Sequence, residues 1–123
     1  MADEAVTVLN LTAGTASADV IVDTEGGQSI SAGDTAVITI DNPADHYIFS
    51  FYGSGAATAT VQAGDNPPAM KAGLGSKALT IPSGDLILAV LDMSRHLHND
   101  GKVRIDIATN AVVVGCHKIP KTI

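Results

Sequence analysis

The sequence predicts an all-β protein: a single-domain antiparallel β-sandwich, Ig-like or jelly-roll-like, that spans residues 1–123. A two-residue period dominates, as in residues 102–107, where Val103, Ile105 and Ile107 alternate with charged side chains. Turn sequences rich in Gly, Pro, Asn and Asp recur about every ten residues, as expected of a sandwich or barrel. No window carries a helical stripe of apolar residues longer than about two turns.

The predicted strands follow from runs of alternating or continuous apolar residues between these turns. In chain order they are residues 6–11, 19–23, 35–41, 46–52, 58–62, 78–81, 86–91, 102–107 and 111–116. Most are rich in β-branched residues, which favour strands. The continuous apolar runs at 86–91 and 111–116 are typical of strands that are covered on both faces. A short helical turn is expected at residues 92–95.

Residues 63–76 form the longest stretch without a strand pattern and predict a long Gly/Pro loop. Pro67 and Pro68 exclude a central strand here and favour an extended path. Loops of this length are uncommon in a compact domain and are often functional. Met70 and Leu74 are apolar, and two alternatives remain open: they anchor a neighbouring subunit or fold back on the base of the loop.

The charges are distributed unevenly along the chain. The net charge is −6, and all seven Lys and Arg lie at or after Lys71, so residues 1–70 carry −9 and residues 71–123 carry +3. This asymmetry suits docking on identical or related subunits, although ordinary variation in a small acidic protein explains it equally well. The acidic balance argues against a nucleic-acid partner.

Other features place the protein among soluble domains made inside the cell. The lone Cys116 cannot form an internal disulfide, and the first residues lack the pattern of a signal peptide. No apolar run approaches the ~18 residues of a membrane span, so no membrane partner is expected. All four aromatic residues lie in the predicted strand 46–52, where Phe49 and Phe51 are expected to fill the core.

No group of residues predicts an active site, a cofactor or a metal. The sequence GLGSK at 73–77 lacks the spacing of a phosphate loop and opens no helix. His96 and His98 would share a face with Asp100, with Cys116 and His117 on a neighbouring strand, but solvent-facing histidines on an edge strand are expected instead. We therefore expect that the protein is not an enzyme.

Several segments of the chain resemble one family of viral structural proteins. They are VQAGDNPPA (61–69), GLG (73–75), LTIPSG (79–84), LDMSR (91–95), NDG (99–101), VRIDI (103–107) and KIPK (118–121). Over residues 46–121 the chain resembles the capsid decoration proteins, also called auxiliary or cement proteins, of tailed bacteriophages. The sequence DMSRH at 92–96 departs from the Glu-Ser-Ala-Arg-aromatic pattern expected in that family.

The resemblance implies a structural virion protein that binds the outer surface of a phage capsid and stabilises the expanded shell. Its expected partner is the major capsid protein. It would be made in the host cytoplasm and then lie on the capsid surface, and it is expected to form a homo-oligomer. The expected interface residues, toward the capsid or a second copy, are Asn66, Pro67, Pro68, Met70, Lys71, Leu74 and Arg95.

Two other functions remain as alternatives. A receptor- or glycan-binding module on a phage head or tail would use an exposed Tyr47 or Tyr52, beside Asp45 and His46, as its binding platform. A small hydrolase is the third alternative, and no sequence motif indicates it.

Overall fold

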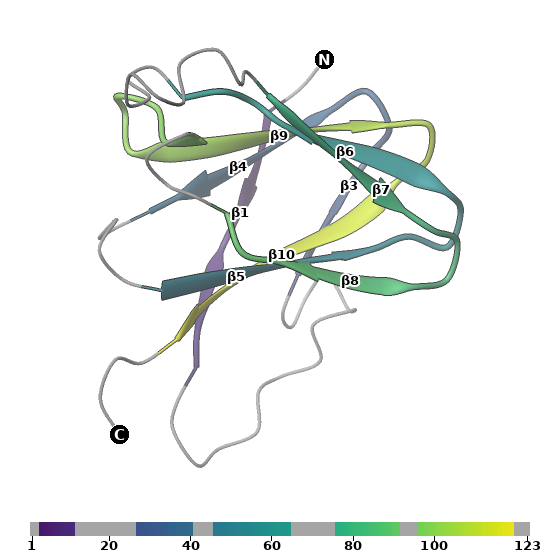
Figure 1. Ribbon diagram of the computed structural model, residues 1–123, viewed down its shortest axis with the longest axis horizontal. Helices are drawn as coiled ribbons and strands as arrows, with labels where there is room; N and C mark the ends of the chain where they lie inside the picture. Colours follow the sequence, from purple (N-terminus) through teal and green to yellow (C-terminus); the bar gives the residue numbers. More distant parts are fainter. Residues whose placement is uncertain (1–2, 12–26, 41–45, 65–75, 92–95, 120–123) are drawn as a thin grey trace.

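Two β-sheets packed face to face make up the computed structural model (Figure 1), which describes residues 3–11, 27–40, 46–64, 76–91 and 96–119. The strands are β1 (Asp3–Val6), β2 (Val8–Asn10), β3 (Gln28–Ile30), β4 (Thr35–Thr39), β5 (His46–Tyr52), β6 (Ala57–Val61), β7 (Lys77–Ile81), β8 (Leu86–Ala89), β9 (Lys102–Ala108) and β10 (Val112–Ile119). The predicted strand 19–23 and the expected turn at 92–95 lie outside the described residues. None of the described segments is a helix with the length and hydropathy that crossing a membrane requires.

The strand order is that of a jelly roll. Sheet A has the order β1-β4-β9-β6-β7, and sheet B has the order β2-β10-β5-β8, with β3 also paired to β10. From β3 to β10, each strand crosses to the opposite sheet, except for the β6–β7 hairpin within sheet A. The predicted β-sandwich is therefore confirmed, and the jelly-roll-like alternative is the one that the strand order matches.

The N-terminal segment joins both sheets. The sequence predicts one strand at 6–11, but the chain breaks its pairing at Thr7, so that β1 lies in sheet A and β2 in sheet B. β1 runs parallel to β4, and β2 runs parallel to β10, whereas all pairings among β3–β10 are antiparallel as predicted. This short segment therefore closes one side of the sandwich (Figure 1).

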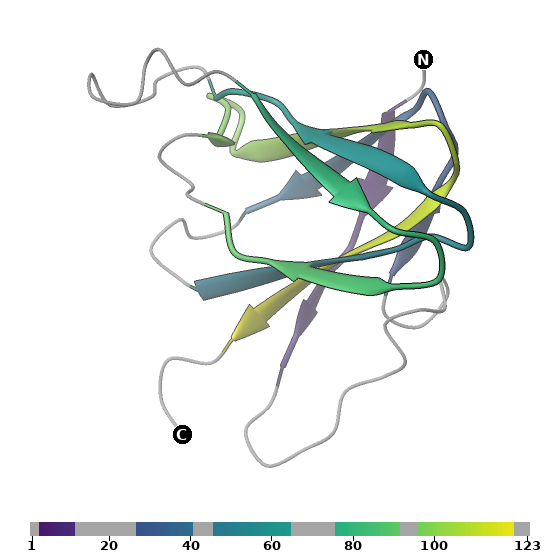
Figure 2. The same ribbon diagram turned by 45° about the vertical axis from the view of Figure 1, so that its right-hand side comes forward.

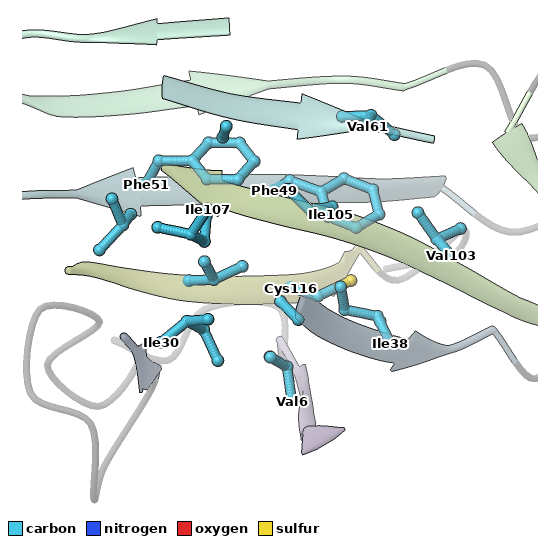
Figure 3. Packing of buried hydrophobic residues seen from close by; sticks show 14 of the residues in the cluster. Val6, Ile30, Ile38, Phe49, Phe51, Val61, Val103, Ile105, Ile107 and Cys116 are labelled. Atoms are coloured by element: carbon cyan, nitrogen blue, oxygen red, sulfur yellow. The ribbon is translucent and has the colours of Figure 1, made fainter. Parts of the chain in front are cut away.

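Aliphatic side chains and two phenylalanines fill the space between the sheets (Figure 3). Phe49 and Phe51 of β5 have no exposed surface, and they lie among Val61, Ile105 and Ile107 from sheet A. The inward positions follow the two-residue period, since β9 alternates buried and half-buried residues along its length. The prediction that Phe49 and Phe51 belong to the core is confirmed.

A candidate interaction face on sheet B

The interface residues expected from the sequence, Asn66, Pro67, Pro68, Met70, Lys71, Leu74 and Arg95, lie outside the described residues, so their role stays a prediction. The described ends of these two segments are in contact. Gly64 lies so close to the backbone of Leu97 that a Cβ on Gly64 would be 2.4 Å from the Leu97 carbonyl oxygen. His96 Nδ1 also lies 3.1 Å from the carbonyl oxygen of Gln62. The chain thus enters segment 65–75 and leaves segment 92–95 at one corner of the sandwich.

Strand β8 differs most from its prediction. Its continuous apolar sequence predicts burial on both faces, but Leu86 is 42% exposed, Leu88 is 61% exposed, and the following Val90 is 78% exposed. Only Ile87 and Ala89 turn toward the core. The prediction is wrong because sheet B packs against sheet A with one face, and no described residue covers the outward side of β8 on the other face.

The exposed leucines belong to a face of sheet B whose described outward positions carry no charge. Directly paired residues share a face of a sheet, and the register pairs Leu88 with Ser50, Leu86 with Tyr52, and Tyr52 with Val113. The outward positions of the described strands of sheet B are Leu9, Ser29, His46, Ile48, Ser50, Tyr52, Leu86, Leu88, Val113, Gly115, His117 and Ile119. We call this surface the sheet B face, and it contains no Asp, Glu, Lys or Arg.

The outward face of sheet A is polar. Its described positions include five threonines and the charged residues Asp3, Lys102, Arg104 and Asp106. Asp106 accepts hydrogen bonds from Thr35 Oγ1 at 2.6 Å and from Gln62 Nε2 at 3.0 and 3.1 Å. Arg104 pairs with Asp100 at 2.6 Å, and this contact holds the pKa of the exposed Asp100 carboxyl below its usual value. The described outward positions of sheet A therefore include charged residues, whereas those of sheet B carry no charge.

A buried polar pair lies at the centre of the sheet B face. The hydroxyl of Ser50 and Nε2 of His117 lie 2.9 Å apart, and both residues are at least nine-tenths buried. His117 Nδ1 has no hydrogen-bond partner among the described residues. Burial lowers the pKa of His117 because it penalises the charged imidazolium. His117 is therefore a neutral group at neutral pH.

The protonation of His117 gives a testable pH dependence. The unfolded chain binds a proton at His117 near pH 6.5, whereas the folded protein resists it. Above pH 6.5, protonation of His117 does not reduce the free energy of unfolding. As the pH falls from 6.5 toward the pKa of His117 in the folded protein, the free energy of unfolding decreases by at most about 1.4 kcal/mol per pH unit. Urea unfolding at a series of pH values measures this loss. His117→Gln should flatten the dependence, while the control His46→Gln, at an exposed position, should retain it; an unchanged slope in His117→Gln would contradict the assignment.

The other candidate groups from the sequence are placed differently from expectation. His96 is buried rather than solvent-facing. Cys116 faces the core, opposite to the neighbouring His117, and burial raises the pKa of its thiol to about 12. The described residues contain no cluster of three or more His, Cys, Asp or Glu that could hold a metal ion.

The tyrosine platform of the glycan-binding alternative is only partly present. Tyr47 is 4% exposed and belongs to the core, so the expectation of an exposed Tyr47 is wrong. It points inward because it shares the alternation of Phe49 and Phe51 on β5. Tyr52 is half-buried on the sheet B face, and Asp45 lies outside the described residues.

The sequence signal that could have located the sheet B face is the absence of charge. The predicted strands 86–91 and 111–116 are continuous apolar runs without a charged residue, a pattern that also predicts burial on both faces. Comparison with known proteins does not add to this picture: no protein-family model, curated protein or solved structure matches the chain. The resemblance to decoration proteins thus depends on the quoted segments alone.

Proposed function

We propose that the protein is a structural coat protein that binds the outer surface of a phage capsid and stabilises the expanded shell. The observation that supports the proposal is the contrast between the two faces of the sandwich. A protein that covers a shell needs one surface that adheres to the shell subunits and one that stays in water. The sheet B face supplies the first kind of surface, and the outward face of sheet A supplies the second.

Exposed apolar surface of this kind is unfavourable in a protein that stays alone in water. Burying apolar area stabilises a complex by about 25 cal/mol per Å², and contiguous apolar patches on soluble proteins mark interaction sites. Leu86 and Leu88 remain substantially exposed on this face. A shell of the major capsid protein presents the same contact many times, so binding to the assembled shell stabilises it by mass action.

The lack of charge on the sheet B face also favours this role. A charged side chain in the middle of a protein contact must lose its hydration, which costs several kcal/mol unless a partner compensates it. No outward strand position of sheet B imposes that cost through a Lys, Arg, Asp or Glu. From the resemblance, we expect the loop residues from Asn66 to Leu74 and Arg95 to contribute further contacts with the shell.

Two matched substitutions test the proposal. Val113 on the sheet B face and Val37 on the outward face of sheet A are both half-buried strand valines. Val113→Lys should weaken binding to purified expanded capsids at least about tenfold, because it places an uncompensated charge in the contact. Val37→Lys should bind like the unmodified chain. Co-sedimentation with capsids, after circular dichroism has shown that both variants are folded, measures occupancy per copy of the major capsid protein.

Equal occupancy for Val113→Lys and the unmodified chain would remove the sheet B face from the contact. The glycan-binding alternative has its own test through Tyr52, the platform residue that stays partly exposed. Glycan binding that Tyr52→Ala abolishes, without association with capsids, would replace the proposed function.

A further inference from the structure

The outer edge of strand β8 carries no neighbouring strand among the described residues. In sheet B this strand pairs only with β5, so one row of its backbone N–H and C=O groups has no strand partner among the described residues. Unpaired edges bind further strands readily. In Figure 2, β8 lies along the margin of its sheet, joined to β7 of sheet A by the turn at 82–85.

The other edge strands carry features that oppose such pairing. β1 contains Asp3 and an inward-pointing Glu4, and β7 begins with Lys77. β2 and β3 have three residues each and include Asn10 or Gln28. Charges, inward-pointing charged residues and short length are the devices by which proteins protect sheet edges. The sequence of β8 is Leu-Ile-Leu-Ala, and none of these side chains is polar.

We propose that β8 pairs with the β8 strand of a second copy of this chain, in an antiparallel two-fold contact centred on Leu88. In this register Leu88 opposes its own copy, Leu86 opposes Val90, and Ile87 opposes Ala89. Each pair lies on one face of the joined sheet, so the three exposed residues of both copies form one apolar row. The large Ile87 of each copy opposes the small Ala89 of the other copy, so the two strands are complementary in shape.

The charges oppose a second copy at this edge, since each chain carries −6, so the apolar row must outweigh their repulsion. The nearest acid, Asp85, would oppose Leu91 of the other copy, which Asp92 follows in the sequence, so each end of the contact places two acids near each other and the pairing should tighten as salt screens them. The two Asp85 residues would be six positions apart along the strands, about 20 Å, and salt screens exposed charges at that separation. The pairing does not depend on the proposed function. It uses the backbone edge of β8, whereas binding to a shell uses the sheet B face. In a dimer, the sheet B faces of the two copies would lie side by side.

Cysteine cross-linking tests the register on the full chain. Adjacent strands bring opposed Cα atoms to about 4.5–5.5 Å, within the range that a disulfide requires. Leu88→Cys should therefore form a disulfide-linked dimer under mild oxidation at least about tenfold faster than Leu86→Cys or Val90→Cys, whose own copies lie about 14 Å apart. An equal mixture of Leu86→Cys and Val90→Cys should cross-link as a heterodimer. The buried Cys116 thiol, with its pKa raised to about 12, does not interfere.

The oligomeric state provides a second readout. The unmodified chain should sediment at twice its 12.5 kDa mass at about 100 µM. Leu88→Lys should sediment as a monomer, because two ammonium groups would oppose each other, and Val37→Lys should remain a dimer. A monomeric unmodified chain, or equal cross-linking rates for the three cysteine variants, would overturn the pairing. Loss of capsid binding in Val113→Lys with the dimer intact would separate this contact from the proposed function.

Discussion

Phe49→Ala is expected to lower the free energy of unfolding by about 3–5 kcal/mol, the usual cost of truncating a fully buried phenylalanine. Phe49 has no exposed surface and lies between the two sheets (Figure 3), so the lost ring leaves a cavity that the surrounding strands cannot fill. Domains of this size are stable by only about 5–15 kcal/mol, and the variant therefore loses a large part of its stability. Urea unfolding followed by circular dichroism measures the change.

The matched control for this prediction is the preceding residue. Ile48 lies on the same strand but points to the sheet B face and is only half-buried. Ile48→Ala should cost about 1 kcal/mol, since fewer atoms lose contacts. Equal losses at the two positions would mean that Phe49 does not occupy the core.

Gly64→Ala is expected to destabilise the protein by about 2–3 kcal/mol, because the added Cβ overlaps with backbone. It would lie 2.4 Å from the carbonyl oxygen of Leu97 and 2.9 Å from the backbone nitrogen of the same residue. Backbone atoms held by neighbouring strands cannot move as a side chain does, so the contact between Gly64 and Leu97 must open. Thermal and urea unfolding measure the loss.

A second glycine separates steric overlap with backbone from the general effect of adding a methyl group. A Cβ on Gly55 would lie 2.9 Å from Nδ2 of Asn110, which is an exposed side chain that can rotate away. Gly55→Ala should therefore cost about 1 kcal/mol or less, mainly through the hydrogen bond that Asn110 donates to the carbonyl of Ala56. If Gly64→Ala costs no more than this control, the close approach of Gly64 and Leu97 is not a constraint on the fold.

The local alternation of apolar and polar residues sufficed to predict most of the fold. The strands containing Phe49, Val103 and Ile105 are where that pattern is strongest, and their inward residues are buried as expected. β3 escaped prediction because its three residues contain one apolar side chain, Ile30, whose burial depends on pairing with β10. The break at Thr7 was not predicted for a similar reason. β1 and β2 belong to different sheets because they pair with β4 and β10, which local sequence does not reveal.

The candidate site was harder to predict, since apolar sequence has two physical explanations. A run such as β8 is apolar when both faces are covered within the chain, and equally when one face contacts another molecule. The exposure of the side chains distinguishes the two, because Leu86 and Leu88 are exposed on the outward side of sheet B, whereas residues 112–116 of β10 are buried or half-buried. Residue pairs distant in sequence, such as Ser50 with His117, likewise require the register before they can be recognised.

The N-terminal segment that joins both sheets has a consequence for how large an assembly can become. β1 and β2 occupy the side of the sandwich remote from β8, so β8 is the one edge among the described strands that lacks charged residues, polar residues or very short length. If two copies join through β8 as proposed, the edges that stay exposed among the described strands are the protected ones, so we expect the assembly to stop at two copies. Removal of the first ten residues would uncover the edge of β4 and the part of β10 that pairs with β2, and we expect that variant to form larger assemblies than the unmodified chain.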